Sequence, residues 1–169
     1  MRCKAVRSER VWPRPPPCSF GRPTYEDFCA VRPNRTDNPF TEVLNNTQKY
    51  VASTTLREPL PWRNSTLLKG DATEAVARLK AQLDKDLVVL GSGVLLQSLM
   101  RRNLVDEYVL QIHPLILGSG RRLFVDGGTF ASLRLVDTKT TSTGVVIATY
   151  QPTGRPGAVE ADRSSRAAV

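Results

Sequence analysis

The length and composition of the chain indicate one globular domain. Its 169 residues are 40% hydrophobic and 24% charged, which allows one buried core but hardly two, and the lack of any apolar run near roughly 20 residues excludes a membrane span. The formal net charge of +8 lies mostly in the first 22 residues, before the first predicted helix, so the charge does not favour nucleic-acid binding.

The cysteines and the histidine argue against a metal site. Cys3, Cys18 and Cys29 have no paired spacing, and His113 is the single histidine of the chain. This pattern excludes a zinc site, and we expect no bound metal. An odd number of cysteines without a secretory signal favours reduced thiols and a cytoplasmic location.

The N-terminal segment before the first predicted helix lacks the hydrophobic periodicity of a helix or strand. Residues 1–18 are rich in arginine and proline, and we expect them to be disordered. The sequence TYEDFCAV then predicts a short helix that Thr24 caps and that ends at Pro33.

The middle of the chain continues with short elements. A second helix is predicted over 39–46 and a strand over 49–53, followed by a proline-broken loop. Asp71, with Glu74 three residues later, predicts the start of a longer amphipathic helix.

The second half of the chain alternates strands and helices. LVVL, at 87–90, is typical of a strand buried on both faces, and GSG turns it into the helix VLLQSLMRR. Further strands are predicted in EYVLQIHPLIL, over 133–140 and over 145–151. The pattern predicts a three-layer α/β/α domain over 19–151, with a mixed, mostly parallel sheet and a C-terminal antiparallel hairpin. We expect a disordered tail over 152–169.

Three segments combine small or hydroxyl residues with a helix start or a strand end, where backbone N–H groups can receive an anion. They are Gly21, Arg22 and Thr24; Ser53, Thr54 and Thr55; and Gly91, Ser92 and Gly93. Each segment alone also fits a structural role: a capped helix with a solvated arginine, a polar loop, and a tight strand-to-helix connection.

Taken in order, four motifs show a family resemblance. GRPTYEDF, KYVAST, LVVLGSGVLLQSLMRRNLVDEY and HPLILGSGRRLF resemble the dihydrofolate reductase-like family, in particular the C-terminal reductase domain of bacterial riboflavin-biosynthesis proteins. The resemblance covers about residues 19–151, and its last two motifs are the most specific.

The resemblance implies an NADPH-dependent reductase that acts on a C=N or C=O bond of a small heterocyclic substrate, as a homodimer. It implies that Pro114 to Arg121 closes the substrate side and contributes to the dimer contact. It assigns the cofactor phosphates to Gly21, Arg22 and Thr24, the adenosine end and its 2′-phosphate to Ser53, Thr54 and Thr55, and the pyrophosphate to the backbone of Gly91, Ser92, Gly93 and Val94.

Two features depart from the family. Its members begin with an apolar strand inside the sheet, which residues 1–18 do not provide, so we expect an incomplete domain with an open groove where that strand belongs. An incomplete start of the reading frame would explain this. Leu90 stands where riboflavin-pathway reductases have a glutamate, which leaves the substrate open between 5-amino-6-(5-phosphoribosylamino)uracil and a pteridine or another small heterocycle.

The catalytic residues remain open at this point. Hydride transfer is chemistry of the nicotinamide, so the protein need not show a catalytic pair. His113 is expected to be structural, and Asp106 and Glu107 are expected to be solvated or paired carboxylates. The alternative to a reductase is a catalytically impaired nucleotide-binding or dimerisation module.

Overall fold

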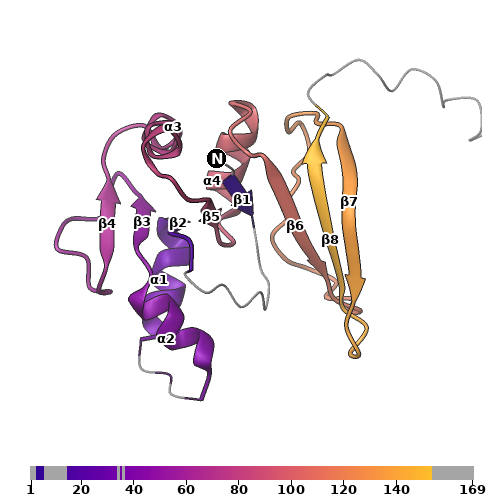
Figure 1. The fold of residues 1–169 in the computed structure, drawn as a ribbon, viewed down its shortest axis with the longest axis horizontal. Helices are drawn as coiled ribbons and strands as arrows, with labels where there is room; N and C mark the ends of the chain where they lie inside the picture. Colours follow the sequence, from indigo (N-terminus) through magenta and orange to yellow (C-terminus); the bar gives the residue numbers. More distant parts are fainter. Residues whose placement is uncertain (1–2, 6–14, 34, 36, 154–169) are drawn as a thin grey trace, which may run out of the picture.

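The computed structural model describes residues 3–5, 15–33, 35 and 37–153. Within these residues the strands form one sheet in the order β4-β3-β2-β5-β1-β6-β8-β7, as Figure 1 shows. The first six strands in that order run parallel, and β8 runs antiparallel to both β6 and β7. No helix in the described part of the chain is long and apolar enough to span a membrane.

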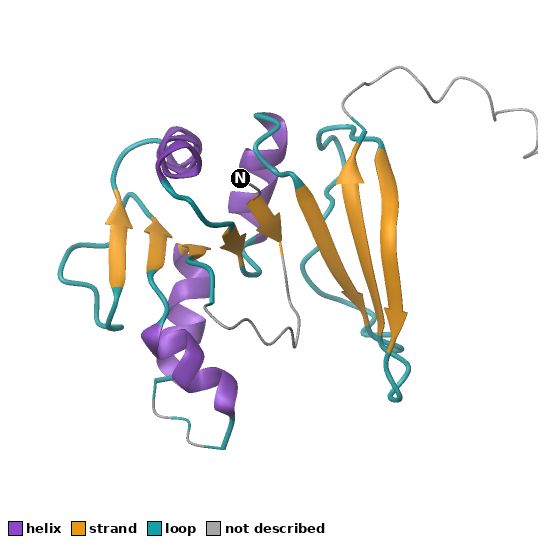
Figure 2. Ribbon diagram, viewed as in Figure 1, coloured by secondary structure: helices purple, strands orange, loops and turns teal. Residues whose placement is uncertain are grey.

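The elements of Figures 1 and 2 have the following bounds. The strands are β1 (Cys3–Ala5), β2 (Cys18–Gly21), β3 (Lys49–Ala52), β4 (Ser65–Leu68), β5 (Leu87–Val89), β6 (Glu107–Ile112), β7 (Leu133–Thr140) and β8 (Val146–Pro152). The helices are α1 (Arg22–Val31), α2 (Pro39–Asn46), α3 (Ala72–Gln82) and α4 (Gly93–Arg101).

Strand β5 shows why the fold has three layers. Its side chains alternate across the sheet, and all of them are buried. Leu87 and Val89 belong to a core cluster that includes residues of α3 and α4, whereas Val88 belongs to a second cluster with residues of α1 and α2. A strand buried on both faces therefore separates two helical layers. The predicted three-layer fold with its mixed sheet is confirmed.

The helix starts confirm one predicted cap and correct another. The Asp71 carboxylate accepts hydrogen bonds from the N–H groups of Thr73 and Glu74 at the start of α3, as expected. Helix α1, however, begins at Arg22 with Gly21 as its N-cap. The predicted capping role of Thr24 is wrong, because its hydroxyl accepts a hydrogen bond from another part of the chain, the N–H of Ser92.

The expectation that residues 1–18 supply no strand is wrong. Strand β1 lies in the sheet between β5 and β6 and pairs with both in parallel, so the groove expected there is filled. Cys18 belongs to β2. The prolines of this segment all follow β1 in the sequence, so they remove no donor from its ladder. The rest of the expected disordered segment, from residue 6 to 14, and the tail from residue 154 lie outside the described residues.

Strand β4 was not predicted. It lies at one edge of the sheet, parallel to β3, and follows the loop that the sequence predicted from its prolines. Trp62, at the end of that loop, is buried, and its indole N–H donates to the Asn45 side chain at 2.6 Å. The loop is thereby anchored to the end of α2, which lets the chain return to the sheet.

Lys49, the first residue of β3, is fully buried. Its Nζ donates to the carbonyl oxygens of Leu44 at 2.8 Å and Thr47 at 2.7 Å, at the end of α2, and stands 4.6 Å from the centre of the Trp62 ring. These contacts satisfy the last carbonyls of α2 with a cation. Burial lowers the pKa of Lys49 to about 8.

Candidate functional site

The three segments predicted to receive an anion lie at one edge of the sheet. They follow the carboxyl ends of β3, β2 and β5, which are neighbours in that order. Gly21 is paired with Ala52 and Ser19 with Val89. From the adjacent strands β2 and β5 the chain enters α1 and α4, which cover opposite faces of the sheet. Such a point, where connections diverge to the two faces, is where open α/β sheets bind ligands.

The two glycine-marked turns at this edge touch each other. The Gly21 N–H donates to Ser92 Oγ at 2.9 Å, and the Ser92 N–H donates to Thr24 Oγ1 at 3.1 Å. Ser92 Oγ also donates to the Leu90 carbonyl oxygen at 3.1 Å. Hydrogen bonds therefore join the two predicted segments through Gly21, Thr24 and Ser92, although 71 positions separate Gly21 from Ser92.

The turn between β5 and α4 has an unusual backbone. Gly91 has a φ of +59°, and Ser92, the N-cap of α4, has a φ of 56° and a ψ of 54°. Both residues are thus left-handed, a conformation that glycine adopts freely and that costs a residue with a Cβ roughly 1 kcal/mol. The hydrogen bonds of Ser92 offset that cost and fix the direction in which α4 leaves the sheet.

The first turn of α4 offers backbone donors to a ligand. Leu96 N–H donates to the Ser92 carbonyl, so the N–H groups of Gly93, Val94 and Leu95 precede the first intrahelical bond. A Cβ placed on Gly93 would meet nothing within 4 Å, and the Val94 side chain is 79% exposed. The start of α4 at Gly93 and Val94 is therefore open to a ligand at the positive end of the helix dipole, whereas Leu95 is buried.

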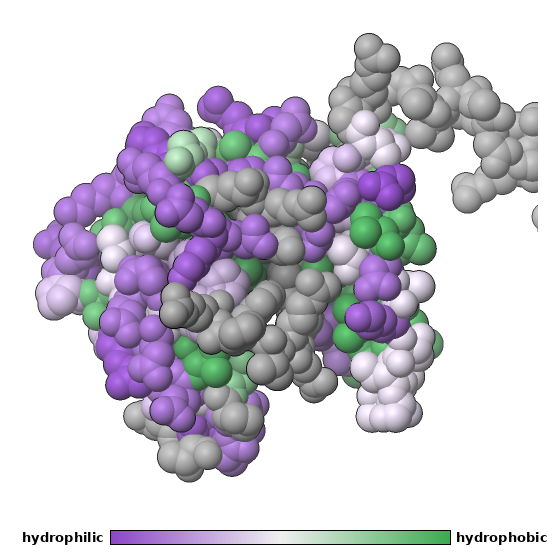
Figure 3. Space-filling view, in the orientation of Figure 1, coloured by the Kyte–Doolittle hydropathy of each residue, from purple (hydrophilic) through white to green (hydrophobic). Residues whose placement is uncertain are grey.

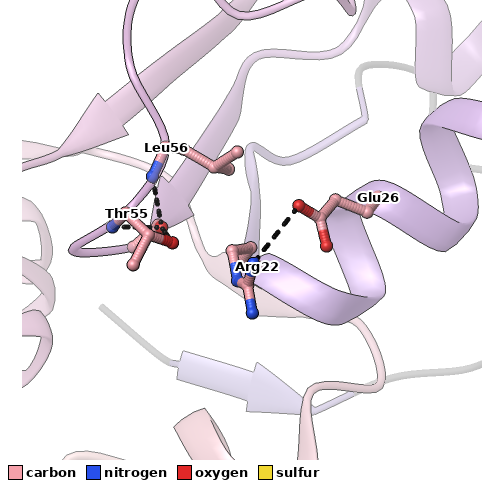
Figure 4. A network of polar contacts seen from close by, with 5 residues as sticks. Arg22, Glu26, Thr55 and Leu56 are labelled. Carbon is pink, nitrogen blue, oxygen red and sulfur yellow. Dashed lines mark hydrogen bonds and ion pairs between the residues drawn. The ribbon is translucent and has the colours of Figure 1, made fainter.

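A cation and a hydroxyl-rich turn complete this edge. Arg22 is about half exposed and lies 3.7 Å from the Glu26 carboxylate. Figure 4 shows its side chain between Glu26 and the turn that carries Thr55 and Leu56. Ser53 Oγ accepts the N–H groups of Thr55 and Leu56, which closes that turn. The Thr54 and Thr55 side chains are exposed.

Other residues with chemical potential lie elsewhere. His113 is exposed beyond the end of β6. Asp106 is bound to Lys80 at 2.6 Å, an ion pair that ties α3 to the approach of β6. Two cavities of about 330 Å³ and 250 Å³ lie beside β4 and α3 and beside the C-terminal half of α4, respectively. Among the residues that the structure describes, the three predicted anion-binding segments gather at the edge formed by β3, β2 and β5.

The residues at this edge fit a dinucleotide phosphate. Open space above Gly93 admits an oxygen close to the backbone, and the nearby charged side chain of Arg22 has the sign that a phosphate requires. Sequence reasoning did not identify Leu95, whose N–H belongs to the same first turn. Its apolar side chain gave no signal, since only the backbone contributes.

Comparisons with known proteins place this geometry in context. The family model described as RibD C-terminal domain matches residues 21–147. Protein YyaP of Bacillus subtilis (strain 168) is 32% identical over 140 residues, which are 80% of this chain and 73% of that protein.

Two solved structures share the fold. One is a Shewanella sp. PV-4 protein whose assignment to riboflavin biosynthesis is provisional, with 22% identity and a TM-score of 0.67 over 88% of this chain and 84% of that one. The other is a pyrimidine reductase-like protein of Corynebacterium diphtheriae, with 13% identity and a TM-score of 0.57 over 80% and 75% of the two chains.

Proposed function

The chain belongs to the RibD C-terminal domain family, and from this premise we propose that it is an NADPH-dependent reductase of a small pyrimidine- or pteridine-like heterocycle. The observation that carries the proposal is the hydrogen-bonded contact between the turns at Gly21 and Ser92. It brings a helix start with unpaired N–H groups and an arginine to one point where the sheet connections diverge.

Each part of this edge has a proposed role toward the cofactor. The N–H groups of Gly93 and Val94 would hold the pyrophosphate, and the Thr24 hydroxyl would donate beside them. Arg22 would contact the 2′-phosphate, because it follows β2 directly and the turn formed by Ser53, Thr54 and Thr55 follows β3, the strand paired with β2. A preference for NADPH over NADH follows from that cation.

The bound nicotinamide would supply the hydride, and the protein would align the acceptor and exclude water. Leu90 is buried in the core cluster on the α1 and α2 side of the sheet, so it offers no charge to a substrate. Reduction of 5-amino-6-(5-phosphoribosylamino)uracil and a dihydrofolate reductase-like reaction remain the two candidate activities. The proposed location is the cytoplasm, where reduced nicotinamide cofactor is present.

A homodimer is the proposed assembly. The described residues include nine large apolar side chains that are at least two-fifths exposed and lie between positions 112 and 136: Ile112, Leu115, Ile116, Leu117, Phe124, Val125, Phe130, Leu135 and Val136. Figure 3 shows hydrophobic patches at the side of the molecule where β7 lies in Figure 1. Nine such side chains are enough for the apolar centre of an interface of roughly 800 Å² per partner.

The alternative is an impaired nucleotide-binding or dimerisation module. Its main support was the expected loss of the first strand, and β1 occupies that place. The two proposals still differ in one measurement. The reductase consumes NADPH when a pyrimidine or pteridine substrate is added, whereas the impaired module binds NADPH without consuming it.

The test is a titration with NADPH and with NADH, followed by an oxidation assay at 340 nm with each candidate heterocycle. Saturable binding, tighter for NADPH, and substrate-dependent oxidation are the expected results. The proposal would be refuted if no binding were detected at millimolar NADPH, since a Kd of 1 mM corresponds to a binding free energy of roughly 4 kcal/mol.

A further inference from the structure

We infer that Ser92 is a positioning residue that holds the two phosphate-facing turns together and does not itself bind the cofactor. This inference rests on the proposed function, because it concerns the same edge of the sheet. It assigns Ser92 a different role from the one that the family resemblance implies.

The hydrogen bonds of the Ser92 hydroxyl carry the argument. A serine hydroxyl has one proton to donate and two lone pairs to accept with. Ser92 gives its proton to the Leu90 carbonyl and accepts the Gly21 N–H. What remains is a lone pair, which repels a phosphate oxygen. The hydroxyl therefore cannot bind a phosphate while both bonds persist.

The backbone N–H of Ser92 is also engaged. It donates to Thr24 Oγ1, and the Gly21 N–H is engaged in turn by Ser92. We call these three hydrogen bonds, which join Gly21, Thr24, Leu90 and Ser92, the clasp. Two N–H groups that the sequence suggests as phosphate ligands thus serve to bind the turns to each other.

The clasp determines where the remaining donors point. It keeps Ser92 left-handed, and the backbone of Ser92 sets the direction of the N–H groups of Gly93 and Val94. Thr24 accepts only one bond in the clasp, so its own proton is left for a phosphate oxygen. The ligand-facing set is therefore the first turn of α4 with Thr24 and Arg22, and Ser92 aligns it.

The first variant is Ser92→Gly. Glycine adopts the left-handed conformation without strain and keeps the N–H that Thr24 accepts, so only the hydroxyl is lost. We expect the apo-protein to exchange the Gly21 amide hydrogen at least about tenfold faster, while the amide at position 92 is unchanged. The Kd for NADPH should rise roughly tenfold, as for one lost hydrogen bond.

The second variant is Thr24→Val, which keeps the branched shape and loses the acceptor. The expected exchange pattern is the reverse: the amide of Ser92 exchanges faster and that of Gly21 does not. Thr24→Ser restores both the protection and the affinity, since it keeps the hydroxyl. Ser98→Ala is the matched control, because the hydrogen bonds of Ser98 within the described part of the chain are to Val94 and Arg101 of its own helix, and it should change neither measurement.

Each result decides the inference. Faster exchange of Gly21 together with weaker NADPH binding by Ser92→Gly supports it. A higher Kd without faster exchange would show that Ser92 contacts the cofactor directly. Faster exchange with an unchanged Kd would show that the clasp does not position the site. Either result overturns the inference. A wild-type chain that binds no NADPH removes the proposed function, whereas binding that Ser92→Gly leaves unaltered removes this inference alone.

Discussion

The Cγ2 methyl of Thr24 occupies the space in front of Gly91: a Cβ added to Gly91 would stand 3.2 Å from it. This contact is closer than a carbon pair prefers, and the φ of +59° at Gly91 is itself unfavourable for a residue with a side chain. The position of Thr24 at the start of α1 therefore requires glycine in the turn after β5. Both the packing of this turn and the proposed site depend on the contact between Thr24 and Gly91.

The first prediction concerns Gly91→Ala. We expect the free energy of unfolding to fall by about 2 kcal/mol, from left-handed strain together with crowding against Thr24. Urea unfolding measures it. Gly70→Ala is the control, because Gly70 has a φ of +80° but nothing within 4 Å, so it carries the strain without the crowding. Equal losses for both variants would show that the Thr24 contact contributes nothing.

The second prediction separates ligand binding from stability at Gly93. A Cβ there meets no atom within 4 Å, and alanine suits a helix better than glycine, so Gly93→Ala should keep the stability or raise it by up to about 1 kcal/mol. The same methyl group would occupy the space proposed for the pyrophosphate. We expect a Kd for NADPH at least roughly tenfold higher, from calorimetry. An unchanged Kd would place the phosphates elsewhere.

The third prediction tests the source of the NADPH preference. Arg22→Gln removes the cation proposed for the 2′-phosphate, so the Kd for NADPH should rise roughly tenfold while the Kd for NADH changes little. Arg78→Gln is a close control, since Arg78 lies 3.8 Å from Glu74 four residues away, as Arg22 lies 3.7 Å from Glu26. Equal effects of Arg22→Gln on both cofactors would argue against a 2′-phosphate contact.

The sequence predicted this edge only in part. The passage from β5 through the glycine turn into α4 is evident in local pattern, because an apolar run, two glycines and a helical period follow one another directly. The clasp is not evident in the sequence, because its partners are 68 and 71 positions apart. The local pattern around Thr24 predicts a helix cap instead. Tertiary contact overrides that local preference.

Strand β1 was missed for a related reason. Three residues near the start of an arginine- and proline-rich segment are too few to show a recognisable strand periodicity. Their strand exists because β5 and β6 each offer a parallel edge to it, and that pairing depends on the assembled sheet. Strand β4 is similar, since the anchoring of Trp62 to Asn45, and not the composition of the loop, directs the chain back to the sheet.

The fourth prediction concerns pH and Lys49. The pKa of Lys49 is lowered by burial from 10.5 to about 8, so between these values the unfolded chain binds the proton that the folded chain has lost. Stability should therefore rise with pH from about 8 upward. Lys49→Met should remove this rise in urea unfolding measured at pH 7.5 to 9.

The neighbouring Cys18 sets the upper limit of that window. Burial raises the pKa of its thiol from 9.0 to about 12, with the Lys49 charge acting in the opposite sense. Above pH 9 the unfolded chain loses this proton first, so the contribution of Cys18 falls as pH rises. Repeating the series in Cys18→Ala isolates Lys49. If the stability of Cys18→Ala, which keeps Lys49, fell between pH 8 and 9, the assignment would be contradicted.

The last prediction concerns the exposed apolar residues that follow β6. Ile116 is 101% exposed and lies between the exposed Leu115 and Leu117. Exposure of three consecutive aliphatic side chains to water is unfavourable. In the proposed homodimer this segment is covered by the second copy, so Ile116→Arg should raise the dimer Kd roughly tenfold or more. Sedimentation across a concentration series measures this. Val31→Arg makes the same change of charge on α1, at a side chain that is 55% exposed, and should leave the dimer intact. A wild-type chain that sediments as a monomer at its highest soluble concentration would rule out the homodimer.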